Sequence, residues 1–398
     1  MQFHDINNVT VAVSDKAGCW PTKDQELLLK AALLDHDEAK DSWNRWESRI
    51  NITNIDNSSY RILPLVYWNL RSFEKDEHIA HILKGVMRKT WYANLMLFRK
   101  TADVISMLVD RNIDTMLLKG AALSSDYYEH DGLRAMEDTD VLIPTKDAPE
   151  VIQQLTASGW YPYHEASYIL DKVFYSVKHG HMFVNGTGQK IDLHWHVLKE
   201  CLIQEADDDF WSESIQYDFR GVPTRVLSHT DQLFHVCVHG LRWEPVAPIR
   251  WVADAWHIIQ KNQEIMDWER LLDLSKKYRV VLTVGKALEY CASVLSMPIP
   301  RSVLKRFSDI NIVLYDRIEY KIRTRFPGVW GHTIQLLAMY FKRYPEVMAT
   351  EPFRYFPGII VYFQYLWNLK TKWLVPIYAM RRCFEIALGK IRLSIGKS

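Results

Sequence analysis

The chain has 398 residues, more than one typical domain, so we expect two or three structural units that share an interface. Hydrophobic residues make up 48% and charged residues 24% of the chain, which is ordinary for a globular protein, and 15 Trp and 20 Tyr supply large side chains for a core. The formal net charge of +1 argues against a protein that coats nucleic acid, and we expect no stable complex with nucleic acid.

Cysteine usage and the first residues bear on the cellular compartment. The five cysteines are odd in number and never spaced as Cys-x-x-Cys: Cys19, Cys201, Cys237, Cys291 and Cys383. This pattern indicates free thiols in a reducing environment rather than a disulfide framework. The N-terminal residues lack the basic stretch followed by an apolar one that a secretion signal would have. The sequence therefore predicts a cytoplasmic protein.

The first predicted region, residues 1–112, is mainly helical. Its clearest element has apolar residues at alternating steps of four and three: Trp91, Leu95, Phe98, Ala102, Ile105 and Val109. That spacing places these side chains on one face of a helix. We expect this face to pack in the core.

The second predicted region, residues 113–227, contains short runs rich in β-branched and aromatic residues, which favour strands. The runs lie at residues 115–118, 139–143, 173–177, 181–184, 190–197 and 224–227. A turn at residues 185–188 joins two of them into a predicted antiparallel hairpin. A helix is predicted over residues 147–158, ending at Gly159. We expect a small mixed sheet in this region.

The third predicted region, residues 228–398, is helical again. Ser228 and Asp231 have the spacing of a capping box, and Gly240 follows as a helix stop. Residues 355–369 carry no charge and precede a basic stretch. Burial of this segment is favoured over contact with an anionic membrane surface, because the apolar run is shorter than a membrane span. The fold is thus predicted to be α+β and rich in helix, with a small sheet flanked by two helical regions.

A pair of acids stands at the start of one predicted strand. Asp138 and Asp140 are two residues apart, so their side chains point to the same side of the strand. Two such carboxylates repel each other unless a cation offsets their charge, and their oxygens suit Mg²⁺ or Mn²⁺. An apolar strand that runs into Lys119-Gly120 precedes the pair. The pattern predicts a metal site for phosphoryl transfer, with a solvated strand end as the alternative.

A third acid lies in a run whose alternate residues are apolar. Asp192, His194 and His196 share one face of this predicted strand, and the opposite face is apolar. A metal shared with Asp138 and Asp140 would offset the cost of burying Asp192, whereas an exposed edge strand is the alternative. His194 is expected to support the end of this strand or to contact substrate.

These motifs resemble a bacterial family of uncharacterised nucleotidyltransferases within the polymerase-β superfamily. The resemblance rests on Lys-Gly, on Arg134 ahead of Asp138 in Arg-x-x-x-Asp-x-Asp, and on Asp192 in apolar-Asp-apolar-His-Trp, and it covers about residues 117–197. It implies a nucleotidyltransferase core that moves a nucleoside monophosphate from an NTP to an acceptor hydroxyl and releases pyrophosphate. It also implies a catalytic metal triad of Asp138, Asp140 and Asp192, with Asp192 on the metal that activates the acceptor hydroxyl.

The nucleotide would lie against the turn after the first strand. Gly120 lacks a Cβ and fits a backbone that approaches a phosphate. Lys119 and Arg134 are candidates for charge-assisted contacts to the triphosphate. The alternatives are that Lys119 is a solvated strand end and that Arg134 pairs with Glu137 or Asp138. The superfamily has Gly-Gly or Gly-Ser at this turn, whereas this chain has Lys-Gly.

The Lys-Gly turn supports a second hypothesis, a non-catalytic module that keeps the fold, binds nucleotide or a partner, and meets a membrane surface through the C-terminal segment. A zinc site is a rival interpretation of two histidine pairs that nothing in the sequence brings together: His194 with His196, and His235 with His239. A toxin-like transferase that modifies tRNA or protein is a third hypothesis, although the net charge disfavours tRNA. The acceptor itself, whether small molecule, peptide or macromolecule, is not encoded in these motifs.

Overall fold

The computed structural model describes residues 18–72, 77–163, 172–202, 207–325, 334, 337–338, 340–341, 358–381 and 383–384. Seven strands form one sheet in the order β3-β4-β5-β2-β1-β7-β6. Their bounds are β1 Met116–Leu118, β2 Asp138–Leu142, β3 Trp160–Pro162, β4 Gly180–Asn185, β5 Lys190–His194, β6 Ile215–Phe219 and β7 Val222–Val226. β1 runs parallel to β7 and β2 runs parallel to β5, whereas the other neighbouring strands are antiparallel. The predicted mixed sheet is confirmed.

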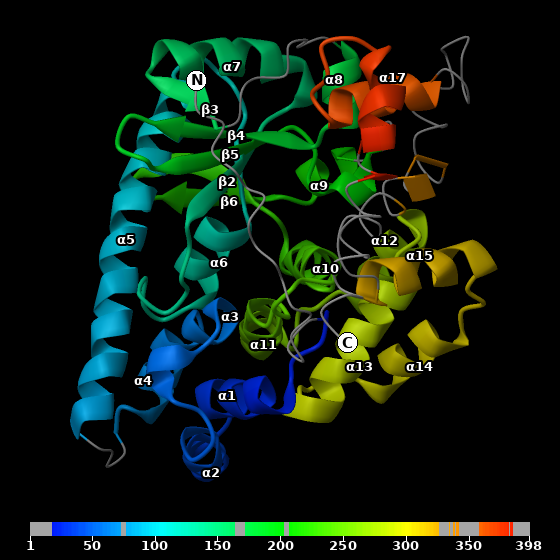
Figure 1. Ribbon diagram of the computed structural model, residues 1–398. Coiled ribbons are helices and arrows are strands. Elements are labelled where there is room, and N and C mark those ends of the chain that lie inside the picture. The colour runs from blue at the N-terminus through cyan, green and yellow to red at the C-terminus, as the bar shows by residue number, and fades with distance from the viewer. Residues whose placement is uncertain are drawn as a thin grey trace.

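Helices surround this sheet (Figure 1). Their bounds are α1 Lys23–Leu33, α2 His36–Glu47, α3 Asn57–Tyr60, α4 Leu63–Leu70, α5 Glu77–Val109, α6 Lys119–Tyr127, α7 Ala148–Ala157, α8 Lys172–Val177, α9 Asp208–Ser212, α10 His229–Gly240, α11 Arg250–Asn262, α12 Trp268–Lys277, α13 Val281–Leu295, α14 Arg301–Asp309, α15 Leu314–Arg325 and α17 Gly358–Leu366. The long α5 runs along one side of the molecule, and α12 to α15 gather on the other (Figure 1). The predicted helix-rich α+β fold is confirmed.

Two hydrophobic clusters lie on opposite faces of the sheet. In β1, Leu117 belongs to one cluster while Met116 and Leu118 belong to the other, because successive side chains of a strand alternate between faces. One cluster joins α1, α2 and α4 to α10 through α14, and the other joins the sheet to α5, α7, α8 and α17. Helices from both ends of the sequence therefore pack together. The division at residues 112 and 227 stays a prediction.

Most predicted elements of the central region are present. The predicted hairpin is β4 with β5, although β5 ends at His194, and α7 confirms the predicted helix over residues 147–158. The predicted strand over residues 173–177 is wrong, because these residues form α8. Phe174 and Tyr175 pack their rings 5.5 and 5.2 Å from that of Trp195, so tertiary contacts decide the conformation of this short run. The strands β3 and β6 are not predicted.

The predicted packing face of α5 is half right. Its second half is buried, at Phe98, Ala102 and Ile105. Trp91 and Leu95 in its first half are 43% and 36% exposed, so the prediction is wrong there. Asn94 is buried instead, and its amide donates to the carbonyl oxygen of Arg134 at 2.8 Å. This polar contact, which a hydrophobic pattern cannot reveal, holds the loop that precedes β2.

The uncharged C-terminal segment packs against the sheet region. α17 contacts α8, and Tyr362 and Phe363 are buried in the cluster that contains the sheet. The predicted burial is thus confirmed for residues 358–366, while residues 355–357 and the basic residues beyond 384 lie outside the described parts of the chain. Among the described helices, none combines the length and the apolar character needed to cross a bilayer.

Candidate active site

Acids from two distant segments meet where β1, β2 and β5 lie side by side. β2 and β5 pair in parallel with Asp140 opposite Asp192, and β1 places Leu118 opposite Asp140. Asp138 begins β2, two residues before Asp140, and all three acids line one cavity. The strand register therefore gathers the acids singled out in the sequence into one place.

Asp140, Asp192 and His194 form the one group of potential metal ligands among the residues that the structure describes. Their ligand atoms all lie within 4.8 Å of one another. The His194 Nε2 atom is 3.0 Å from Asp192 Oδ2 and 3.2 Å from Asp140 Oδ1. Asp138 lies outside this group, on the wall of the cavity. Carboxylate oxygens and a neighbouring imidazole nitrogen are common ligands of divalent cations.

Lys119, the first residue of α6, extends into this group directly after β1 ends. Its Nζ donates to Asp140 Oδ1 and lies 3.3 Å from His194 Nε2. The side chain is 17% exposed, so the alternative of a solvated strand end is wrong. The ammonium instead offsets part of the charge of the acids.

Asp138 and Asp140 differ in how readily they ionise. Burial favours a higher pKa for Asp140, but Lys119 and His194 outweigh burial and hold this pKa below its usual value. For Asp138, burial and the two neighbouring carboxylates raise the pKa. Burial alone would lower the pKa of His194, yet Asp192 and Asp140 raise it to about 9. These carboxylates therefore favour the charged form of the imidazole, and the Lys119 ammonium adds a positive charge beside the three acids.

Arg134 forms a separate buried ion pair beside these acids. Its Nε and Nη2 donate to the two carboxylate oxygens of Asp254 in α11, at 2.7 and 2.8 Å. The hydroxyl of Tyr128 donates to the same carboxylate at 2.6 Å. Arg134 thus pairs with neither Glu137 nor Asp138, the partners that the sequence left open. Two of its three nitrogens are already engaged.

Gly120, the second residue of α6, leaves room for Arg134. A Cβ at this position would lie 2.7 Å from Arg134 Nη1 and 2.5 Å from Met136 Sδ. Gly120 also lines the cavity, in the first turn of a helix whose leading N–H groups have no intrahelical partner. Its missing side chain therefore has a packing reason and also leaves the backbone open toward the cavity.

A cavity of about 340 Å³ lies over the acids. Its far wall comes from α10, α11 and the segments beside them, with the side chains of His235, His239, Arg242 and Arg250. Arg61, just before α4, also lines it. Arg61 and Arg242 are not among the residues that stand out in the sequence, whereas Arg250 lies in the segment 249–254, a weaker part of the family resemblance. For Arg250 a pattern exists, because Asp254 follows four residues later on the same helix face.

The four candidate zinc histidines do not form one site. His196 Nδ1 contacts Asp207, while the rings of His235 and His239 stack on α10 with centroids 5.7 Å apart. Of the four, His194 alone belongs to the group of potential metal ligands in the described parts of the chain. The geometry does not support the zinc interpretation.

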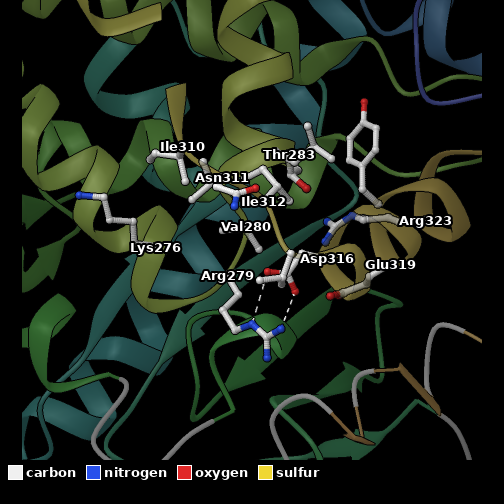
Figure 2. Close-up of a pocket in the computed structure, with 14 residues that line it drawn as sticks. Lys276, Arg279, Val280, Thr283, Ile310, Asn311, Ile312, Asp316, Glu319 and Arg323 are labelled. Atoms are coloured by element: carbon white, nitrogen blue, oxygen red, sulfur yellow. Dashed lines mark hydrogen bonds and ion pairs between the residues drawn. The ribbon is translucent and has the colours of Figure 1, made fainter. Parts of the chain in front are cut away.

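A second cavity of about 340 Å³ lies between α12, α13 and α15. Figure 2 shows Arg279 and Asp316 paired in its lining, with Arg279 Nη2 2.8 Å from Asp316 Oδ1. Apolar side chains such as Val280, Ile310 and Ile312 line the rest, and the acids of β2 and β5 do not reach it. The polar cavity over the acids is therefore the candidate active site.

Comparison with solved structures finds distant neighbours. The solution structure of the antibiotic-resistance factor ANT(2'')-Ia is 12% identical, with 50% of this chain and 97% of that chain covered and a TM-score of 0.34. The crystal structure of an antigenic nucleotidyltransferase-like protein from Paracoccidioides brasiliensis is 14% identical, with 53% and 96% covered and a TM-score of 0.35. TM-scores this low do not establish a common fold. No curated protein matches the chain.

A family model covers the larger part of the sequence. The model described as an uncharacterised nucleotidyltransferase matches residues 58–296 of the 398. This range contains the whole sheet, the Lys119-Gly120 turn, the three acids and the wall formed by α10 and α11. The chain belongs to this family of uncharacterised nucleotidyltransferases.

Proposed function

We propose that the protein transfers a nucleoside monophosphate from an NTP to an acceptor hydroxyl and releases pyrophosphate, with Mg²⁺ or Mn²⁺ held by Asp138, Asp140 and Asp192. The observation that carries this proposal is the parallel register that sets Asp140 opposite Asp192 at the base of a polar cavity. The bound metal would neutralise phosphate charge and align the attacking and leaving oxygens. A cluster of three acids, one of them with a raised pKa, fits a divalent cation.

The turn and α6 would hold the triphosphate. Gly120 brings backbone N–H groups to the cavity, and Lys119 supplies a positive charge beside the acids. Arg134 uses Nε and Nη2 for Asp254, so we assign its remaining nitrogen, Nη1 beside Gly120, to a phosphate oxygen. Each role is proposed for a group that already faces the cavity.

His194 would act as a positioning residue. Its side chain is 1% exposed and bridges Asp140 and Asp192. This geometry favours support of the Asp192 strand end over direct contact with substrate, the second role considered for His194. The acceptor would enter along the wall of α10 and α11, where Arg242 and Arg250 offer donors. A polar or anionic acceptor suits that wall.

The proposal is tested by incubating the purified protein with Mg²⁺, labelled nucleoside triphosphates and a broad panel of acceptors. We expect labelled product and pyrophosphate from the wild type and none from Asp138→Asn or Asp140→Asn. Asp273→Asn is a matched control, because Asp273 is an exposed carboxylate on α12 with a side chain that is 72% exposed. Nucleotide binding that is independent of Mg²⁺ and unchanged by both substitutions would overturn the proposal.

The contact between Lys119 and Asp140 favours a second candidate, a module that binds nucleotide without turnover, because the ammonium takes up an acid that catalysis needs for metal. Metal-dependent nucleotide binding without product, across the whole acceptor panel, would favour this candidate. Product formation from any acceptor would exclude it.

We also propose that the protein is cytoplasmic and touches anionic membrane surfaces through residues 370–381. Trp373, Ile377 and Met380 are exposed at helical spacing, 76%, 59% and 65% respectively. Lys372 and Arg381 lie in the same segment and match anionic lipid. Sedimentation with phosphatidylserine vesicles should capture the wild type and not Trp373→Ser/Ile377→Ser. Equal capture of both proteins, or capture by phosphatidylcholine alone, would contradict this contact.

A further inference from the structure

Lys119 has an unusual backbone for a lysine. Its φ angle is +45°, in the left-handed region, at the junction of β1 and α6. A residue with a Cβ is strained there, whereas glycine is not, and such strain tends to persist at functional sites. The next residue, Gly120, has no positive φ. The strained position thus carries the charged side chain and not the glycine.

The position of Lys119 in the sheet aims it at the acids. Leu118 is paired with Asp140 across β1 and β2, so the residue that follows Leu118 leaves the strand beside Asp140. The Lys119 ammonium then contacts Asp140 Oδ1, the same oxygen that lies 3.2 Å from His194 Nε2. Asp140 belongs to the group of potential metal ligands, together with Asp192 and His194. The ammonium therefore holds a carboxylate that a metal at this site would need.

We infer that Lys119 is a built-in counter-cation that competes with a divalent metal for Asp140 and yields the carboxylate when metal and triphosphate bind together. This inference rests on the proposed function, because it takes Asp140 as a metal ligand. Two cations repel each other at one carboxylate oxygen, so metal binding displaces the ammonium. The triphosphate then supplies the displaced ammonium with a new anionic partner.

Lys119 lines the main cavity, in which the triphosphate is proposed to bind. It also lines a smaller cavity of about 140 Å³ with Lys199, Arg242 and Arg323, so a displaced ammonium is expected to move toward the main cavity instead. A long flexible side chain can exchange one partner for another at this junction without a change of fold. Metal alone is therefore held weakly, and metal with nucleotide is held more firmly. The affinities for metal and for nucleotide are thus coupled through Lys119.

The test measures the affinity for Mn²⁺ alone, by electron paramagnetic resonance of free Mn²⁺, with no nucleotide present. Lys119→Gln removes the charge at similar length, and Lys119→Gly removes it while relieving the left-handed strain, so at least one variant should fold. We expect both to bind Mn²⁺ about tenfold more tightly than the wild type, within the range typical of coupled sites. Lys305→Gln, at an exposed lysine of α14, should leave the affinity unchanged.

The outcomes separate this inference from the proposed function. Mn²⁺ binding that Asp140→Asn abolishes, but that Lys119→Gln and Lys119→Gly leave equal or weaken, would overturn the competition and leave the metal site standing. Absence of any Mn²⁺ binding that depends on Asp140 would overturn the metal site and the competition together. Tighter binding in both neutral variants, with Lys119→Arg close to the wild type, is the result we expect.

Discussion

Two buried pairings of a cation with a carboxylate border the same cavity, and they differ in how fully their polar atoms are matched. The Arg134 guanidinium meets both oxygens of Asp254, which also accepts the hydroxyl of Tyr128. At the other pairing, Lys119 meets a single oxygen of Asp140, and two more acids stand nearby. In the first pairing, the closed pair, both carboxylate oxygens are engaged, whereas the second pairing leaves carboxylate oxygens for a further ligand.

This difference separates a pairing that mainly holds the fold together from one that can accept a metal ion. A bidentate arginine–carboxylate pair with a third hydrogen bond holds α11 against the loop before β2 and leaves only Nη1 of Arg134 for a ligand. An acid cluster with too few cations gains from a divalent metal. The pKa shifts agree with this distinction. The neighbouring cations lower the pKa of Asp254 and of Asp140, whereas the pKa of Asp138 is raised.

The largest expected effect is loss of transfer on removing one charge from the acid cluster. We expect Asp140→Asn to lower the transfer rate by about 10³-fold or more, because metal ions contribute several kcal/mol to charge stabilisation in the transition state. The free energy of unfolding should change less than in Asp254→Asn, since Asp138 and Asp192 still face Lys119. If Asp140→Asn keeps the transfer rate and mainly lowers the free energy of unfolding, the role of Asp140 is structural. Single-turnover assays with denaturant unfolding check both quantities.

The next effect is on stability at the closed pair. Asp254→Asn leaves the buried Arg134 charge uncompensated, so we expect the free energy of unfolding to fall by about 3–5 kcal/mol. The control is Asp41→Asn at the exposed Asp41–Arg45 pair, with an expected loss below about 1 kcal/mol. Urea denaturation measures both. Similar losses for the two variants would remove the contrast between closed and exposed pairs.

A smaller effect concerns pH, through a histidine on the cavity wall. Burial lowers the pKa of His235 to about 3, so this imidazole is neutral in the folded protein and protonates first in the unfolded chain. Because the unfolded chain binds a proton that the folded protein does not, His235 lowers the free energy of unfolding as the pH falls. This loss is absent at pH values above the unfolded pKa of about 6.5 and reaches about 2 kcal/mol at about pH 5. Urea unfolding should show a pH dependence reduced by that amount in His235→Asn. His81→Gln, at an exposed histidine of α5, should keep the wild-type dependence.

An effect of similar size is expected at the glycine between the two pairings. Gly120→Ala places a Cβ against Met136 Sδ, which can move, and against Arg134 Nη1, which Asp254 holds. We expect a loss of stability of about 1–3 kcal/mol. Thermal unfolding measures this loss. Combining Gly120→Ala with Asp254→Asn should give less than the sum of the two losses, because both act on Arg134; strict additivity would count against that link.

The acid cluster could be predicted from the sequence because its geometry is local. Residues two apart on a strand share a face, so Asp138 with Asp140 and Asp192 with His194 follow from period two. Their meeting needs only that two strands pair, and the motif resemblance supplied that pairing. The short α8 was mistaken for a strand because burial, not periodicity, decides such a run.

The closed pair could not be predicted in the same way. Arg134 and Asp254 lie on elements from different parts of the chain, and the contact depends on how α11 packs beside α6. Arg61 reaches the cavity for the same reason, through the packing of the N-terminal helices against α11. Sequence patterns report faces of single elements, whereas these contacts depend on how whole elements are placed.

We propose that the acids of β2 and β5 hold a metal through which nucleotide binds. This is tested by equilibrium binding of labelled nucleoside triphosphates, with and without Mg²⁺, to the wild type and to Asp138→Asn/Asp192→Asn. We expect binding that requires Mg²⁺ in the wild type and is lost in the double variant, with the variant still folded by circular dichroism. Binding that persists without Mg²⁺, or in the folded double variant, would contradict it.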